Sequence, residues 1–136
     1  MTSPHTIAQA QLAQRTHGSE TEIARCLTQA KATPHVMTRM YTDAALQSAR
    51  DTDRLRQAGA PLGPLAGLPV TIKDLFDVQG ETTMAGTVVC EGEPQALADA
   101  PAVARLRQAG AVILGKTNMS EFAFWGSAST RTTARL

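Results

Sequence analysis

The sequence has 136 residues, which is the length of a single modest domain. Its 13 lysines and arginines against 12 acidic residues give a net charge of +1, which excludes a basic nucleic-acid-binding arm or an acidic tail as the main feature. Hydrophobic residues make up 43% of the chain, so wholesale disorder is excluded as well. Because only 4% of the residues are aromatic, a core must be built from alanine, valine, leucine and isoleucine.

The sequence predicts a cytoplasmic protein. The first 23 residues hold no apolar run of the ~7–15 residues that a signal peptide needs, and the apolar stretch over residues 109–115 is far too short to span a membrane. Cys26 and Cys90 lie far apart without a CxxC partner, so we expect two reduced thiols rather than a disulfide. The three histidines have no cysteine or carboxylate at ligand spacing, and we expect no metal site and no cofactor.

Three helices are predicted in residues 1–60, which we interpret as an N-terminal helical segment. An Ala/Gln-rich stretch over residues 6–17 should form a weakly amphipathic helix that ends near Gly18. A second helix should begin at Ser19 and stop before Pro34, and a third is expected over residues 43–58. The side chains expected to face a core are Ile23, Leu27, Ala30, Ala45, Leu46, Ala49 and Leu55.

The composition changes at residues 60–69, where three prolines and two glycines exclude a helix. The β-branched run after them predicts a short buried strand over residues 70–72 with Lys73 at its end, and a second buried strand is predicted over residues 111–114. The other expected elements are an extended continuation over residues 75–78, a helix over residues 99–109 with Asp99 as its N-cap and Pro101 in its first turn, and a short helix over residues 117–122.

A strand, a crossover with a helix and a second strand form a βαβ unit, which predicts an α/β protein with a parallel sheet. Parallel sheets are covered on both faces and normally contain more strands than the two or three visible here. We therefore expect a sheet that is incomplete in this chain, as in a part of a larger domain.

Residues 110–117 match the nucleotide-binding pattern G-x-x-x-x-G-K-[ST]. That pattern works when a strand leads into a phosphate-cradling loop and then a helix. Here the predicted order is a helix, a glycine and a strand, and the residues between the two glycines are Ala-Val-Ile-Leu, which favour a buried strand. No later apolar strand ends in an acidic partner for magnesium. We therefore reject phosphate binding by this segment.

Lys73 is the candidate for chemistry. A lysine held in apolar surroundings loses solvation, which favours the neutral amine and makes it a usable base. Strand alternation places Thr71 and Lys73 on one face and Ile72 and Asp74 on the other, so Asp74 is not automatically the partner of Lys73. From the local sequence alone, an ordinary solvated lysine at a strand end explains the residue equally well.

Several motifs together resemble the opening part of an amidase signature family enzyme. They are residues 63–74 (GPLAGLPVTIKD), residues 80–87 (GETTMAGT), Asp99-Ala100, residues 106–112 (LRQAGAV) and residues 115–123 (GKTNMSEFA). Their order and spacing both match, and the resemblance spans roughly residues 43–126. It implies the amidase signature fold, in which helices surround a mixed, largely parallel sheet.

The resemblance also implies an amide-bond hydrolase with a Ser–cis-Ser–Lys triad, in which Lys73 is the base. A bridging serine would carry a proton from the nucleophilic serine to the neutral lysine, and backbone N–H groups would hold the oxyanion. The substrate would be a small amide, with no nucleic acid or membrane as partner. Thr82, Thr83, Gly86, Asn118, Met119 and Glu121 also match the family, and we interpret them as architectural. Thr87 stands where the family commonly has serine.

Both family serines would lie further along the chain than Leu136, within a Gly/Ser-rich segment. Ser127 and Ser129 lack the neighbouring glycines that an oxyanion hole needs, and we reject them as substitutes. We therefore expect residues 61–126 to be the start of the amidase core, carrying the lysine but neither serine, and the chain to be inactive and poorly folded alone.

The resemblance stops after Gly126, and residues 127–136 are interpreted as a tail foreign to the family. One nucleotide encoding of the family-like segment Leu-Asn-Pro-His-Tyr-Gly-Thr-Ala, read one base later, gives Ser-Thr-Arg-Thr-Thr-Ala-Arg-Leu, which is the sequence of residues 129–136. Our hypothesis is that a frameshift produced these residues. Two alternatives to a truncated amidase stay open: a part of the amidase subunit of a tRNA-dependent amidotransferase, and a non-catalytic helical or binding module.

Overall fold

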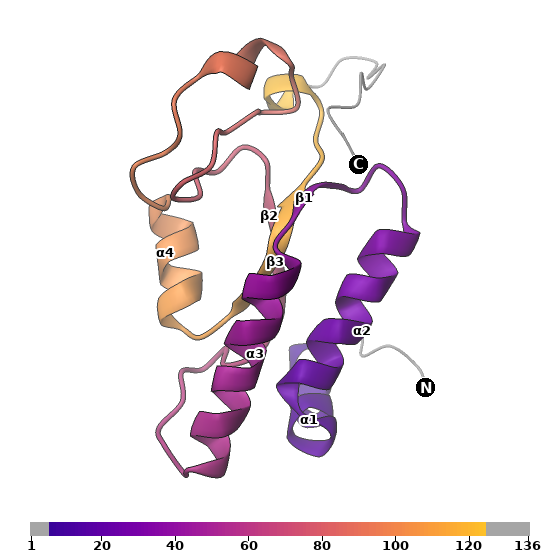
Figure 1. Cartoon of the computed structure of the whole chain (residues 1–136), viewed down its shortest axis with the longest axis vertical. Coiled ribbons are helices and arrows are strands. Elements are labelled where there is room, and N and C mark those ends of the chain that lie inside the picture. The colour runs from indigo at the N-terminus through magenta and orange to yellow at the C-terminus, as the bar shows by residue number, and fades with distance from the viewer. Residues whose placement is uncertain (1–5, 125–136) are drawn as a thin grey trace.

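The computed structural model describes residues 6–124. In chain order its elements are α1 (Ile7–His17), α2 (Ser19–Ala32), β1 (Met37–Met40), α3 (Thr42–Gln57), β2 (Pro69–Lys73), the 3-10 helix η1 (Val89–Gly92), α4 (Pro101–Gln108), β3 (Val112–Thr117) and the 3-10 helix η2 (Glu121–Ala123) (Figure 1). Four of the five predicted helices and both predicted strands are present. The short helix expected over residues 117–122 is only the single turn of η2, because β3 continues to Thr117.

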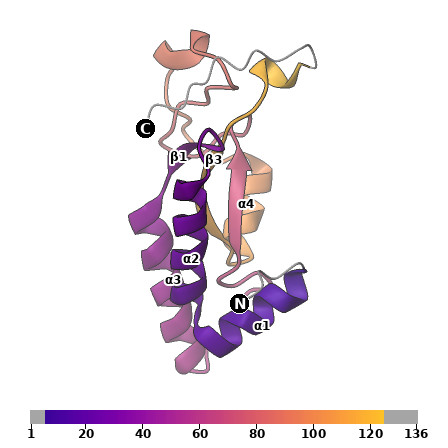
Figure 2. The same ribbon diagram turned by 90° about the vertical axis from the view of Figure 1, so that its right-hand side faces the viewer.

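The three strands form one mixed sheet in the order β1–β3–β2. β2 and β3 are parallel and are joined by a crossover that contains α4, which confirms the predicted βαβ unit. β1 pairs antiparallel with β3 and was not predicted, since its four residues show no alternating pattern. In the view of Figure 2, β2 stands at one edge of the sheet, beside α4.

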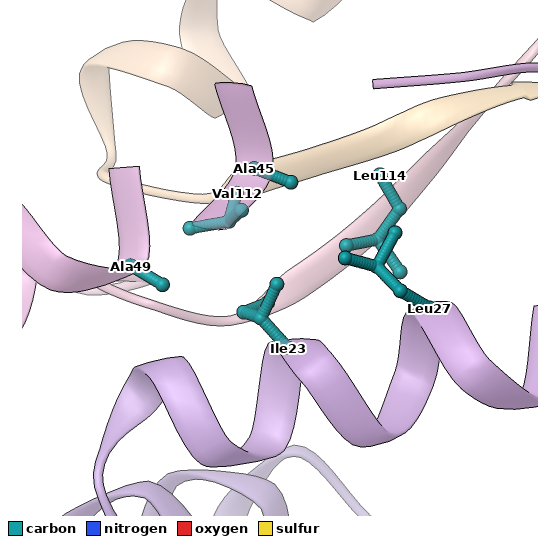
Figure 3. Close-up of a cluster of buried hydrophobic side chains, with 6 residues drawn as sticks. All are labelled: Ile23, Leu27, Ala45, Ala49, Val112 and Leu114. Atoms are coloured by element: carbon teal, nitrogen blue, oxygen red, sulfur yellow. The ribbon is translucent and has the colours of Figure 1, made fainter. Parts of the chain in front are cut away.

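Two apolar clusters cover the two faces of β3. The helical cluster consists of Ile23, Leu27, Ala45, Ala49, Val112 and Leu114, and it joins α2 and α3 to one face (Figure 3). The α4 cluster consists of Ile72, Val78, Val103 and Ile113, and it joins α4 to the other face. Because successive side chains of a strand point to opposite faces, Val112 and Leu114 serve one cluster while Ile113 serves the other.

The three N-terminal helices are joined by polar contacts. The N-cap of α2 is Gly18, which offers no side chain, and the carboxylate of Asp53 in α3 accepts hydrogen bonds from the backbone N–H groups of Ser19 (2.9 Å) and Glu20 (3.0 Å) instead. Gln14 of α1 is buried and its side-chain amide donates to the carbonyl of Gly67. The Asp53 contacts hold α3 against the start of α2, and the Gln14 contact holds α1 against the loop that precedes β2.

Three local expectations were wrong. Asp99 does not cap α4, whose N-cap is Ala100; its carboxylate accepts from the backbone N–H of Gln79 (2.8 Å) and from Arg107 (2.7 Å). Residues 75–78 are not extended, because the chain turns directly after β2 and the N–H of Phe76 donates to the carbonyl of Lys73 (3.0 Å). Leu55 of α3 is half-exposed, whereas Ala45 and Ala49 are buried as expected.

In the part of the chain that is described, no helix is long and apolar enough to cross a membrane.

Candidate functional site

Lys73 lies at the carboxyl end of β2 with its side chain exposed. The predicted alternation is confirmed: Thr71 and Lys73 are exposed, while Ile72 and Asp74 are 4% and 1% exposed. The apolar surroundings expected for Lys73 are therefore not supplied by residues 6–124. Within the same residues Lys73 makes no ion pair, so its side-chain nitrogen is available to a group that approaches this end of the sheet.

Asp74, the residue that directly follows β2, forms a buried ion pair with Lys116 of β3. The Oδ1 and Nζ atoms are 2.7 Å apart, and the two side chains are only 2% and 3% exposed. Within residues 6–124 neither of these two atoms has a further hydrogen-bond partner. The backbone at this position is fixed as well, because the N–H of Asp74 donates to the carbonyl of Thr117 (3.0 Å) and its carbonyl accepts from the N–H of Ala85 (2.8 Å).

A bulge in β3 makes this ion pair possible. Val70 pairs with Ile113 but Thr71 pairs with Gly115, so Leu114 is an extra residue with no partner in β2. Without the bulge Lys116 would share the face of Val112 and Leu114 and point toward α2 and α3. The extra residue turns Lys116 to the other face, where Asp74 lies.

Gly115 is the residue that permits the bulge. Its φ is +153°, which side chains rarely adopt. A Cβ at this position would also overlap the carbonyl oxygen of Arg39 in β1.

A cleft of about 440 Å³ opens beside the ion pair. Its walls include Asp74, Lys116 and a second ion pair between Arg39 and Glu81. Lys73 does not line it, since it projects from the opposite face of β2. Near the cleft, burial raises the pKa of the Tyr41 phenol above its ordinary value, and the negative charge of Glu81 adds to the rise, so Tyr41 stays neutral.

The residues interpreted as architectural do make contacts within the fold. Thr83 donates to the carboxylate of Asp77 (2.7 Å), Thr82 donates to the carbonyl of Glu93 (3.1 Å), and Asn118 donates to the carbonyl of His35 (3.1 Å). Thr87 is buried and its hydroxyl accepts from the N–H of Val89 (3.2 Å). These contacts shape the loops around the strand ends. Glu121 is exposed at the start of η2.

The segment that matches the nucleotide-binding pattern folds in the predicted order. Gly110 ends α4 with a φ of +89°, and residues 112–117 form strand β3 rather than a phosphate-cradling loop. Lys116, the lysine of the pattern, is buried against Asp74. The side chain that would reach a phosphate is thus committed to an ion pair inside the protein.

The remaining sequence predictions concern residues outside the described range, metal ligands and the two cysteines. Ser127, Ser129 and the tail over residues 127–136 lie outside them. Among residues 6–124 no three His, Cys, Asp or Glu side chains gather as metal ligands. Cys26 and Cys90 are free thiols, and burial raises the pKa of Cys26, which keeps that thiol protonated.

The Asp74–Lys116 pair is the feature of this site that sequence reasoning missed. Strict alternation places Lys116 with the apolar residues of the helical cluster, and only the bulge reverses this. The available signal was Gly115, since an isolated glycine inside a strand pattern often marks a bulge.

Comparison with known proteins gives a consistent result. A family model described as Amidase matches residues 21–135, a range that includes most of the segment interpreted as a foreign tail. The chain is similar to the A subunit of the glutamyl-tRNA(Gln) amidotransferase of Salinispora tropica, with 48% identity over 94 residues that cover 68% of this chain and 19% of that protein. It is also similar to the AtzE component of the 1-carboxybiuret hydrolase of Pseudomonas sp. (strain ADP), with 53% identity over 72 residues, or 53% of this chain and 16% of that protein.

Solved structures share the fold. An inhibitor-bound vestigial protein complex, described as revealing the evolutionary origins of an s-triazine catabolic enzyme, superimposes with a TM-score of 0.82 and 36% identity. The match covers 90% of this chain and 28% of that one. The present chain thus spans about a fifth of the length of the curated relatives it matches.

Proposed function

The chain belongs to the amidase family, and on that premise we propose that it carries the lysine base of an amide hydrolase, with Lys73 in that role. The observation that supports this most directly is the position of Lys73. It is exposed at the carboxyl end of a parallel strand, and in open α/β sheets ligands bind outside the carboxyl ends of the strands. It also forms no ion pair among residues 6–124.

The chemistry proposed for Lys73 is proton transfer. As the neutral amine, it would accept the proton of a serine nucleophile through a bridging serine while the nucleophile attacks the amide carbonyl. Neither serine is among the described residues, so residues of a longer polypeptide would complete the site and cover Lys73. The 136-residue chain alone is expected to be inactive, and the complete protein is expected to act on a small amide in the cytoplasm.

The test begins with the DNA that follows codon 136. We expect a neighbouring reading frame to encode a Gly/Ser-rich continuation, and a locus without one would contradict the proposal of a frameshifted tail. The product of the restored frame is then assayed for ammonia release from a panel of small primary amides. Lys73→Met should lower kcat by about 10²–10⁴-fold, which is the usual contribution of a general base.

Lys31→Met is the matched control, because Lys31 is an exposed lysine on another element, the last turn of α2. It should retain full activity. If Lys73→Met hydrolyses amides as fast as Lys31→Met, Lys73 is not the base.

A second candidate function is supported by the relatives themselves. Several curated proteins similar to this chain are glutamyl-tRNA(Gln) amidotransferase A subunits, from Salinispora tropica at 48% identity to Streptomyces avermitilis at 42%. On this alternative the restored protein would release ammonia from glutamine when its partner subunits are present. A glutaminase assay with and without those subunits separates the two functions, because a stand-alone amidase needs no partner.

A further inference from the structure

We propose that the buried Asp74–Lys116 ion pair is a positioning pair that fixes the direction in which Lys73 leaves β2. The proposal rests on the function proposed above for Lys73. It adds two positioning residues that do not touch the reacting atoms.

Residue 74 is fixed at three points. Its N–H donates to Thr117, its carbonyl accepts from Ala85, and its carboxylate meets Lys116 at 2.7 Å. Asp74 directly follows Lys73, and its side chain is buried where that of Lys73 is exposed, so holding Asp74 in place holds the exposed direction of Lys73 as well. The ion pair therefore acts on Lys73 through the backbone of one peptide unit.

Lys73 needs such support because nothing among residues 6–124 restrains its own side chain by an ion pair. It is the last residue of β2, and the chain turns directly after it, with the N–H of Phe76 donating back to the carbonyl of Lys73. Strand ends open more readily than strand centres. A side-chain anchor on the next residue prevents this end from rotating.

The two buried side chains are charged, although an apolar pair could fill the same space. Two buried charges cost desolvation energy, and an apolar pair of similar volume often gives equal or greater stability. A charged pair, however, is stabilised only when its two charged groups lie in contact with each other. Here that arrangement also requires the bulge at Leu114 and Gly115, which turns Lys116 to the face of Asp74. The pair therefore contributes more to the orientation of Lys73 than to the free energy of unfolding.

The first experiment uses the 136-residue chain and measures amide hydrogen exchange. In Asp74→Asn and Lys116→Met the backbone amides of residues 74 and 85 should exchange at least about tenfold faster relative to that of Val112, which lies at the other end of the β2–β3 ladder. Val103→Ala is the matched control, because it loosens the α4 cluster without touching the pair.

In Val103→Ala the three amides should change together. An unchanged ratio in the pair variants, or a wild-type chain in which the amide of Val112 is protected while those of residues 74 and 85 are not, would overturn the proposal.

The second experiment uses the protein from the restored reading frame. Lys116→Met should lower kcat by about tenfold to a hundredfold with KM nearly unchanged, since small misplacements of a catalytic group cost rates of this order. Lys116→Arg, which keeps the charge, should recover most of the loss. The double variant Asp74→Asn with Lys116→Met should be no slower than either single variant, because the two residues act as one unit.

The outcomes separate the two proposals. If the wild-type protein hydrolyses no amide, or Lys73→Met stays active, the proposed function fails, while the exchange ratio still decides whether the pair anchors the strand end. If Lys73→Met is inactive but Lys116→Met keeps its full kcat, the positioning role is wrong and the proposed function stands.

Discussion

Replacing Asp53 should weaken the attachment of α2 to α3 and lower the free energy of unfolding. Its carboxylate accepts two backbone N–H groups of the first turn of α2, at 2.9 and 3.0 Å, and it also pairs with Arg56. Because the N-cap residue Gly18 has no side chain, Asp53 serves as the cap of α2 from another helix. Loss of a side-chain cap costs about 0.5–2 kcal/mol, and hydrogen bonds to a charged group are stronger than average. We therefore expect Asp53→Ala to lower the free energy of unfolding by about 2 kcal/mol and Asp53→Asn by about 1 kcal/mol.

The same site predicts a pH dependence. Partial burial alone would raise the pKa of Asp53, but the N–H donors of Glu20 and Ser19, the Ser19 hydroxyl and the charge of Arg56 outweigh it and hold the pKa below its ordinary value of 3.8. A depressed pKa stabilises the folded chain above the unfolded-state pKa, and this contribution disappears as the pH falls through the folded-state pKa. The stability difference between wild type and Asp53→Asn should thus be constant from about pH 7 to 5 and shrink below about pH 4.

Urea unfolding followed by circular dichroism measures both effects. Asp51→Ala is the matched control, because Asp51 lies on the same helix, is half-exposed, and among residues 6–124 pairs with Gln47 and Arg54 of its own helix. It should cost less than about 0.5 kcal/mol, as exposed ion pairs do. An equal loss of stability in Asp51→Ala and Asp53→Ala would refute the capping role of Asp53.

Three further predictions concern β3, the α4 cluster and Lys73. Gly115→Ala should destabilise the chain by more than about 2 kcal/mol, because its Cβ would overlap the backbone of Arg39, and thermal unfolding should show a lower Tm; a wild-type Tm would mean that the bulge tolerates a side chain. Val103→Ala removes a side chain that is 1% exposed and should cost about 1–3 kcal/mol in urea unfolding, against less than about 0.5 kcal/mol for Val89→Ala at an exposed position. Lys73→Met should leave the stability of the 136-residue chain within about 0.5 kcal/mol, so a larger loss would assign Lys73 a structural role.

Local patterns predicted most of the elements. The ends of the first two helices follow from Gly18, Ser19 and Pro34, and the strand over residues 69–73 follows from its β-branched residues. These signals are local, because each affects the backbone only within a few residues of its own position. Alternation also predicted correctly that Asp74 and Lys73 lie on opposite faces. The family motifs predicted the family, which a match over residues 21–135 confirms. The role of Lys73 remains a prediction.

Contacts between distant residues could not be predicted in this way. β1 exists because residues 37–40 find an open edge of β3, almost eighty positions further along the chain, and its own residues show no strand pattern. Asp99 has the pattern of a helix cap, yet its carboxylate is used by Gln79 and Arg107, which the fold brings to it. In each case a partner distant in sequence outweighed a local preference.

Lys116 shows this division most clearly. Its neighbours along the chain were enough to establish that it follows an apolar strand and cannot lie in a phosphate-cradling loop. The face that Lys116 occupies, by contrast, follows from the folded sheet, because one extra residue in β3 reverses the alternation and brings it to Asp74. The physical reason is that side-chain direction along a strand is a local property, whereas register between strands depends on both strands of the pair at once.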